Sequence, residues 1–158
     1  MVDFVNKPSY SLDDLKIIVS ILHSPGGCPW DREQTHESIR KNMLEEANEV
    51  VEAINEKNTD NLREELGDVL MQVLHHALIS ESNGNFNLDD IADTASKKLI
   101  RRHPHVFSNQ VAADGTEAVA RWENIKQIEK LAKEQGRRID DMTPEEIESL
   151  SKQVKLGK

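Results

Sequence analysis

The sequence predicts an all-α protein that folds as an antiparallel helical bundle. Aromatic residues make up only 4% of the 158 residues, whereas Glu, Leu, Ala and Lys, which favour helix over strand, are abundant. Apolar residues recur at helical spacing in several segments, and no segment shows the alternation of a β-strand. The segments are joined by short connections, which favour antiparallel neighbours.

Six helices are expected, and polar residues mark several of their starts. Ser11 with Asp14, and Asp114 with Glu117, have the spacing of a capping box. Proline after His103 ends the fourth helix, because a residue before proline disfavours the helical conformation. The expected helices cover about residues 11–24, 36–57, 61–81, 87–102, 116–134 and 143–154.

The chain is expected to divide into a helical domain and a tail. Residues 1–135 hold the long apolar patterns, so they are expected to form the domain. Residues 136–158 are expected to form a polar C-terminal tail with one short helix.

Charge and cysteine content narrow the partners and the compartment. The formal net charge of −9 argues against nucleic acid, which needs a basic surface. No apolar run approaches the ~20 residues of a membrane span, and the N-terminus does not have the pattern of a signal peptide. Cys28 is the only cysteine, so no intrachain disulfide can form. We therefore expect a cytoplasmic protein that binds neither nucleic acid nor membranes.

Carboxylates interrupt the apolar stripes of the second and third helices. Glu46 lies three residues after Met43 and four before Val50, which are the spacings of a core-facing position. Glu65 stands in the same relation to Leu62 and Val69. The pattern predicts that two neighbouring helices turn acidic side chains toward each other.

Each of these glutamates has an acidic partner one turn further along its helix. Glu49 follows Glu46, and Asp68 follows Glu65, at the spacing that places side chains on one face. Four converging carboxylates repel one another unless a cation lies between them, and an all-oxygen site suits Mg²⁺ or Mn²⁺. Because Mg²⁺ often recruits substrate phosphates, the pattern indicates phosphate chemistry.

Two other interpretations of the acidic residues were open. The glutamates could form surface ion pairs with Arg40, Lys41 or Arg63. A ferritin-like di-iron site needs two Glu-x-x-His motifs, and only Glu33 with His36 has that spacing. Two acidic pairs at stripe positions on consecutive helices favour the hard-cation site.

The acidic residues and three further segments resemble the MazG-type nucleoside triphosphate pyrophosphohydrolases. The signature of that family is EExxE followed by ExxD on the next helix. The segments GCPWDREQTHESIR, KLIRRHPHVF and RWENIKQIEK are also similar to family segments, so the resemblance extends over roughly residues 12–132. Many members carry two tandem copies of this module, and this sequence contains one, similar to the first copy. The residues that match the signature are Glu45, Glu46, Glu49, Glu65 and Asp68.

The resemblance implies a fold, a reaction and an assembly. The fold is the all-α bundle of the nucleoside triphosphate pyrophosphohydrolases, completed by assembly into a homodimer or a larger homo-oligomer. The reaction is Mg²⁺-dependent hydrolysis of a nucleoside triphosphate to the monophosphate and pyrophosphate, which would limit nucleotide pools. Mn²⁺ is the alternative ion. Glu46, Glu49, Glu65 and Asp68 would hold the metal, and Glu45 and Glu46 are the candidate catalytic residues, with Glu45 as the general base.

Four further residues are expected to bind substrate. Lys98 and Arg102 lie four residues apart on one helix, so both can reach one triphosphate. The alternative is that these basic residues lie in solvent at the end of the helix, where they favour the helix dipole. This alternative is our expectation for Arg101. By resemblance, Trp122 and Lys126 would contact the base and a phosphate; the alternative for Trp122 is a core anchor.

The loop CPWDREQT, residues 28–35, is expected to cover the site. Trp30 would be its packing anchor, and Cys28 has no assigned chemistry. His75 and His76 are expected to face a partner helix or solvent rather than a metal.

Two other functions stay open. A non-catalytic module that binds nucleotides or a protein partner would not need all five signature carboxylates. A relative with a narrow substrate, such as deoxyuridine triphosphate or a phosphoribosyl nucleotide, would keep them. The CPWDREQT and RRHPHVF segments favour the broader MazG type.

Overall fold

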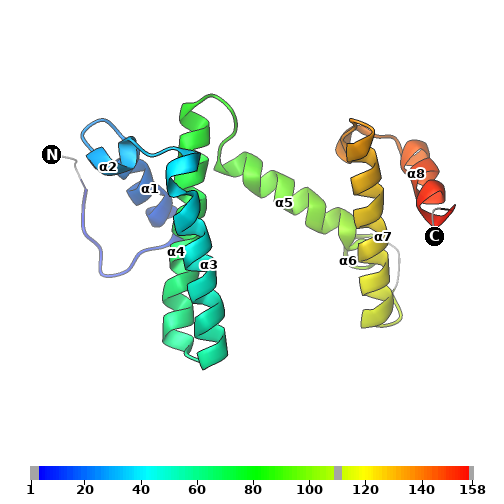
Figure 1. Ribbon diagram of the computed structural model, residues 1–158, viewed down its shortest axis with the longest axis horizontal. Coiled ribbons are helices and arrows are strands. Elements are labelled where there is room, and N and C mark those ends of the chain that lie inside the picture. Colours follow the sequence, from blue (N-terminus) through cyan, green and yellow to red (C-terminus); the bar gives the residue numbers. More distant parts are fainter. Residues whose placement is uncertain (1–3, 109–111, 157–158) are drawn as a thin grey trace. The chain divides into compact units, whose positions relative to one another are not determined.

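The computed structural model describes residues 4–108 and 112–156 as helices joined by loops (Figure 1). No strand occurs within these ranges, which confirms the predicted all-α class. The helices are α1 (Leu12–His23), α2 (Pro29–Arg32), α3 (His36–Glu56), α4 (Thr59–Ser82), α5 (Leu88–Arg102), α6 (Pro104–Phe107), α7 (Gly115–Glu134) and α8 (Pro144–Leu156), with a 3-10 turn η1 (Ile139–Asp141) between α7 and α8.

All six predicted helices are present, with ends within about two residues of the prediction. The sequence analysis missed α2 and α6. Each is a single turn that begins at a proline, and four residues carry no periodic apolar pattern.

The helix starts follow the polar signals. The Ser11 hydroxyl accepts the Asp14 N–H, and the Asp14 carboxylate accepts the Ser11 N–H at 2.9 Å, so this capping box is confirmed. Asp114 accepts the Glu117 N–H at 2.9 Å as predicted. The Glu117 carboxylate, however, accepts the N–H of Ala113 at 2.7 Å, one residue earlier than a capping box requires.

The chain forms two compact units. The N-terminal unit covers residues 1–91 and the C-terminal unit residues 92–158, so the boundary falls inside α5. The predicted domain division into residues 1–135 and 136–158 stays a prediction.

In the N-terminal unit, α3 and α4 form a helical hairpin (Figure 1). The connection is short because Lys57 takes a left-handed conformation and Asn58 caps α4. Helix α1 packs on α4, and α2 packs on α1. The hairpin fixes the facing sides of α3 and α4, on which the acidic residues lie.

The C-terminal unit has its own small core. Helix α7 contributes Ile128 and Ala132, η1 contributes Ile139, and α8 contributes Leu150, all buried. The short helix predicted within residues 136–158 is therefore α8, and it packs against α7.

In the described parts of the chain, no helix combines the length and the apolar character that crossing a membrane requires. The cytoplasmic location stays a prediction.

A tight backbone contact holds the turn between α1 and α2. The N–H of Cys28 donates to the carbonyl of Leu22 at 2.8 Å. A Cβ on Gly27 would lie 2.2 Å from the carbonyl oxygen of Ile21 and 2.4 Å from that of Leu22. Only glycine lets the chain fold back this closely onto the end of α1.

We predict that Gly27→Ala lowers the free energy of unfolding by about 1–3 kcal/mol or more, because backbone atoms cannot move aside as a side chain can. Gly67→Ala in α4 is the matched control. A Cβ there meets nothing within 4 Å, and alanine is favoured over glycine inside a helix by roughly 0.5–1 kcal/mol. Urea unfolding followed by circular dichroism measures both. Equal effects at the two glycines would contradict the steric explanation.

Candidate functional site

Three of the four predicted metal ligands converge where α3 and α4 pack together. Glu46 and Glu49 lie one turn apart on α3, and Glu65 comes from α4. One carboxylate oxygen from each of them lies within 4.8 Å of the other two. We call these three residues the glutamate cluster.

The cluster is partly removed from water and crowded with negative charge. Glu65 is 9% exposed and Glu46 is half-buried, as their stripe positions predicted. Burial raises the pKa of Glu46, and the charges of Asp68, Glu49 and Glu45 raise it further. Burial also raises the pKa of Glu65. A hydrogen bond with Glu49 and the neighbouring negative charges raise this pKa further.

These two pKa shifts determine how pH changes the contribution of Glu46 and Glu65 to the stability of the fold. A carboxyl with a raised pKa in the folded state contributes stability below its ordinary pKa. That contribution is lost as the pH rises through the raised value, because the carboxylates then repel one another. Glu46 and Glu65 therefore contribute less to the stability of the folded chain once they are ionised than they do in acid.

No basic side chain offsets the repulsion. Across residues 4–108 and 112–156, none of the four predicted ligands forms an ion pair with Lys or Arg. Arg63, a proposed surface partner, pairs instead with Asp60 at 3.2 Å. The surface ion-pair interpretation therefore loses its basis.

Asp68 and Glu45 flank the glutamate cluster. Asp68 is half-buried one turn beyond Glu65 and lies outside the group within 4.8 Å, but its charge raises the pKa of both Glu46 and Glu65. Glu45 is exposed beside Glu46 and also raises the pKa of that residue. The donor set is all carboxylate oxygen, which fits a hard divalent cation.

Three of the four predicted substrate residues contact one another in the C-terminal unit. The guanidinium carbon of Arg102 lies 4.8 Å from the centre of the Trp122 ring. The Lys126 ammonium lies 4.9 Å from the same ring centre. Both cations are thus stabilised by the indole face. Lys98 is exposed on α5 and makes no ion pair within the described residues.

A carboxylate that sequence analysis missed binds both arginines at the end of α5. Arg102 donates through Nε at 3.1 Å and through Nη2 at 2.5 Å to Glu129, and Arg101 donates to the other oxygen of Glu129 at 2.8 Å. Burial raises the pKa of Glu129, but the hydrogen bonds from Arg102 and Arg101 outweigh it and hold the pKa below its usual value. The expectation that Arg101 belongs to a solvated helix end was wrong, because Arg101 also pairs with Asp140.

The loop CPWDREQT folds differently from the expectation. Trp30, the predicted packing anchor, is 57% exposed, whereas the next residue, Asp31, is 7% exposed. Helix α2 is a single turn, so adjacent residues point in different directions, and the turn buries the carboxylate in place of the indole.

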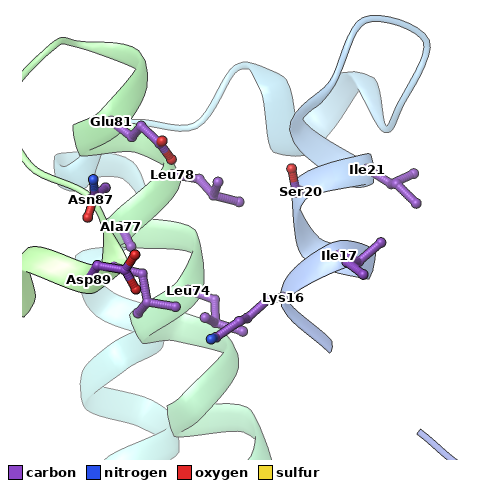
Figure 2. A pocket seen from close by; sticks show the side chains of 11 residues that line it. Lys16, Ile17, Ser20, Ile21, Leu74, Ala77, Leu78, Glu81, Asn87 and Asp89 are labelled. Atoms are coloured by element: carbon purple, nitrogen blue, oxygen red, sulfur yellow. The ribbon is translucent and has the colours of Figure 1, made fainter. Parts of the chain in front are cut away.

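A cavity of about 480 Å³ lies between α1, α4 and the start of α5 (Figure 2). Its walls carry apolar side chains that include Ile17, Ile21 and Leu74, with Lys16 and Glu81 among the charged groups. None of the predicted catalytic, metal-binding or substrate-binding residues lines it.

Comparisons with known proteins identify the family. Residues 34–107 match the MazG nucleotide pyrophosphohydrolase domain, and this range contains all five signature carboxylates. The chain is 46% identical over 132 residues to the nucleoside triphosphate pyrophosphohydrolase/pyrophosphatase MazG of Thermotoga maritima, covering 84% of this chain and 50% of that protein. It is 43% identical over 148 residues to the nucleoside triphosphate pyrophosphohydrolase of Escherichia coli, covering 93% of this chain and 56% of that protein.

A solved structure agrees with these matches. The crystal structure of a MazG-related protein from Thermotoga maritima has a TM-score of 0.59 and 28% sequence identity, over 71% of this chain and 95% of that one. The chain spans only 50% and 56% of the lengths of the two curated relatives. The domain match, the relatives and the shared fold together show that residues 34–107 of the chain belong to a MazG nucleotide pyrophosphohydrolase domain.

Proposed function

We propose that this protein hydrolyses nucleoside triphosphates to nucleoside monophosphates and pyrophosphate, with a divalent cation held by the glutamate cluster. The observation that carries the proposal is the convergence of Glu46, Glu49 and Glu65 without a basic partner. The names of the Thermotoga maritima and Escherichia coli relatives support the same reaction. A role in limiting nucleotide pools would follow from this activity.

The proposed ligands are Glu46, Glu49, Glu65 and Asp68, and Mg²⁺ is the expected ion, with Mn²⁺ as the alternative. When bound, the cation supplies positive charge that offsets the negative charge on the phosphate oxygens. The carboxylates would hold it by oxygen atoms only, and a bound cation would reduce their mutual repulsion.

Glu45 is the proposed general base. It is exposed next to Glu46, so it can accept a proton from a water molecule on the solvent side of α3. The oxygen of that water forms a new bond to phosphorus, and the anhydride bond between the α- and β-phosphates breaks. Pyrophosphate leaves, and the proton passes from the water to Glu45.

Substrate contacts are proposed for Lys98, Arg102, Trp122 and Lys126. Ammonium and guanidinium groups match phosphate oxygens, and an indole can stack on a base. The proximity of Arg102 and Lys126 to the Trp122 ring supports a shared role for these three residues.

The two competing functions make different use of the carboxylates. A non-catalytic binding module would have no need to gather unpaired glutamates at the cost of their repulsion. An enzyme restricted to deoxyuridine triphosphate or a phosphoribosyl nucleotide would share the cluster. A panel of nucleotides, assayed for release of pyrophosphate, separates the broad from the narrow enzyme.

We further propose that a second copy of the chain covers the α3–α4 hairpin. Large apolar side chains are exposed on both helices, namely Leu44, Val51, Ile54, Leu66 and Leu70. Their burial would contribute roughly 25 cal/mol for each Å² of apolar surface removed from water.

The first prediction concerns the metal and the product. We expect hydrolysis to need Mg²⁺ or Mn²⁺, to stop in EDTA, and to release pyrophosphate. Glu46→Gln and Asp68→Asn should each lower activity at least about 100-fold, because even outer-shell partners of a metal contribute about 10- to 100-fold. Glu52→Gln, an exposed glutamate on α3, is the matched control.

Thermal melting in EDTA shows whether these variants fold. Removing one charge relieves repulsion, so the Tm of Glu46→Gln should equal or exceed that of the wild type. A large fall in the metal-free Tm would mean that Glu46 is a structural residue. Full activity in EDTA, or orthophosphate as the first product, would contradict the proposed reaction.

The second prediction is that the chain assembles into a homodimer or a larger oligomer. Light scattering across micromolar concentrations should give a mass at least twice the 17.9 kDa of one chain. Leu66→Glu should shift that mass toward the monomer, because a charge in the covered face costs desolvation energy. A monomer at every concentration would refute the proposed assembly.

The third prediction separates substrate binding from the ion pair of Arg102. Arg102→Ala should lower kcat/KM by about 10- to 100-fold, the effect of one charge-assisted hydrogen bond. Glu129→Gln breaks the same ion pair but keeps the guanidinium, so its activity should stay closer to the wild type. Equal losses in the two variants would show that Arg102 acts through Glu129 and does not contact substrate.

Lys98→Ala provides an independent arm of this experiment. Lys98 makes no ion pair with any residue that the structure describes, so the kcat/KM of Lys98→Ala should fall to a similar extent while its Tm stays unchanged. The neighbouring Lys97, which pairs with Asp93 at 2.6 Å, is the matched control for loss of a positive charge.

A further inference from the structure

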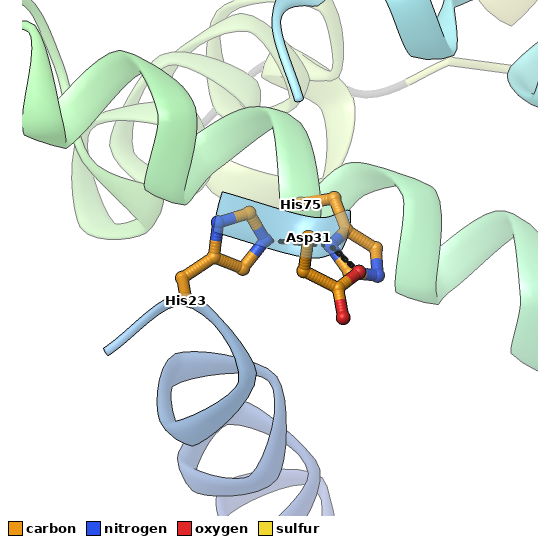
Figure 3. A group of neighbouring side chains, drawn as sticks. All are labelled: His23, Asp31 and His75. Atoms are coloured by element: carbon orange, nitrogen blue, oxygen red, sulfur yellow. Dashed lines mark hydrogen bonds and ion pairs between the residues drawn. The ribbon is translucent and has the colours of Figure 1, made fainter. Parts of the chain in front are cut away.

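Two histidines and an aspartate from three separate segments meet in the N-terminal unit (Figure 3). His23 ends α1, Asp31 lies in α2, and His75 lies in α4. Nε2 of His23 is 2.8 Å from Nδ1 of His75, and that Nδ1 is 3.9 Å from Oδ1 of Asp31. One ligand atom from each residue lies within 4.8 Å of the other two.

Among the described residues, buried Asp31 has no basic partner at hydrogen-bond distance. Its residue is 7% exposed, and its carboxylate accepts no hydrogen bond from any described residue. The nearest group that could carry positive charge is His75, beyond hydrogen-bond distance. An ionised carboxylate in such a place is costly unless a positive charge accompanies it.

Burial disfavours the charged form of both imidazoles beside Asp31. Burial lowers the pKa of His75, the His23 ring lowers it further, and together they outweigh the Asp31 charge. Burial likewise lowers the pKa of His23, again against the Asp31 charge. Neutral imidazole is the form in which histidine binds metals.

We infer that His23, Asp31 and His75 form a binding site for a first-row transition-metal ion of the Zn²⁺ type. Two imidazole nitrogens with one carboxylate oxygen suit Zn²⁺ and its neighbours in that row, whereas Mg²⁺ prefers oxygen ligands only. The ion would supply the positive charge that Asp31 needs. This site is separate in residues and in chemistry from the glutamate cluster.

The geometry needs only small side-chain adjustments to accept the ion. Ligands at about 2.0–2.1 Å in tetrahedral arrangement lie about 3.3 Å from one another. The two nitrogens must therefore separate by about 0.5 Å, and the Asp31 oxygen must approach His75 by about 0.6 Å. His23 then carries its proton on Nδ1 and His75 on Nε2, a tautomer change in one ring that releases no net proton.

Solvent can reach the cluster from the His23 side. A cavity of about 330 Å³ is lined by His23, Ser24 and Gln34, among others. Three protein ligands leave at least one coordination position for water from this cavity. A bound ion would join α1, α2 and α4, which are distant in sequence, so it should also stabilise the N-terminal unit.

The test uses the full chain, freed of metal and then titrated with Co²⁺ in excess Mg²⁺. The excess Mg²⁺ occupies oxygen-only sites, and Co²⁺ absorbs visible light strongly in a four-coordinate site such as the one proposed but weakly in a six-coordinate site. We expect one Co²⁺ for each chain, displaced by Zn²⁺, and a rise in Tm with either ion. Asp31→Asn and His75→Gln should each weaken Co²⁺ binding by at least about tenfold.

The neighbouring histidine pair is a matched control. Nδ1 of His36 lies 2.8 Å from Nδ1 of His76, the residue next to His75, but no carboxylate completes that pair among the described residues. His76→Gln should therefore leave Co²⁺ binding unchanged. If Asp31→Asn or His75→Gln fails to fold, the half-buried His23→Gln replaces it.

Three results would overturn the inference. One is the absence of Co²⁺ or Zn²⁺ uptake in excess Mg²⁺, which would leave only a hydrogen-bonded cluster. Another is equal loss of binding in His76→Gln, which would indicate adventitious histidine binding. The last is loss of the Co²⁺ absorption in Glu65→Gln, which would place the ion at the glutamate cluster. None of these results depends on whether the chain hydrolyses nucleotides.

Discussion

Repulsion among the carboxylates at the α3–α4 contact is the constraint on which the account of this protein depends. The hairpin forces Glu46, Glu49 and Glu65 together, and burial raises the pKa of Glu46 and Glu65. No lysine or arginine of the described chain pairs with them. Residues in such an arrangement contribute little to the stability of the fold once they are ionised, which supports the proposal that they bind a cation.

Asp31 is another buried carboxylate without a basic side chain at hydrogen-bond distance among the described residues, but its surroundings differ from those of the glutamate cluster. It is a buried carboxylate, but its neighbours are two imidazoles and not other carboxylates. The two proposed sites would differ in the cations they take: oxygen-only ligation at the glutamate cluster suits Mg²⁺, and mixed nitrogen and oxygen ligation at His23, Asp31 and His75 suits a softer ion. Each of them includes one residue of α4, namely Glu65 in the first and His75 in the second.

The sequence predicted those features that depend on spacing along one helix. Glu46 and Glu65 were found because a carboxylate at a core-facing position breaks a regular apolar pattern. Features that depend on contacts between distant segments were missed. Asp31 is buried by a four-residue helix and by its position near His75, neither of which has a periodic signal. Glu129 binds Arg101 and Arg102 together because long arginine side chains can bend to one carboxylate, although adjacent helical residues start about 100° apart.

The most direct test of the central claim is anomalous diffraction from a crystal of the full chain soaked in Mn²⁺. Manganese binds oxygen ligands as Mg²⁺ does and can be located by its anomalous signal. The account predicts a peak within coordination distance of carboxylate oxygens from Glu46, Glu49 and Glu65. Ordered glutamate side chains with no peak between them, in a crystal that binds Mn²⁺ elsewhere, would contradict it.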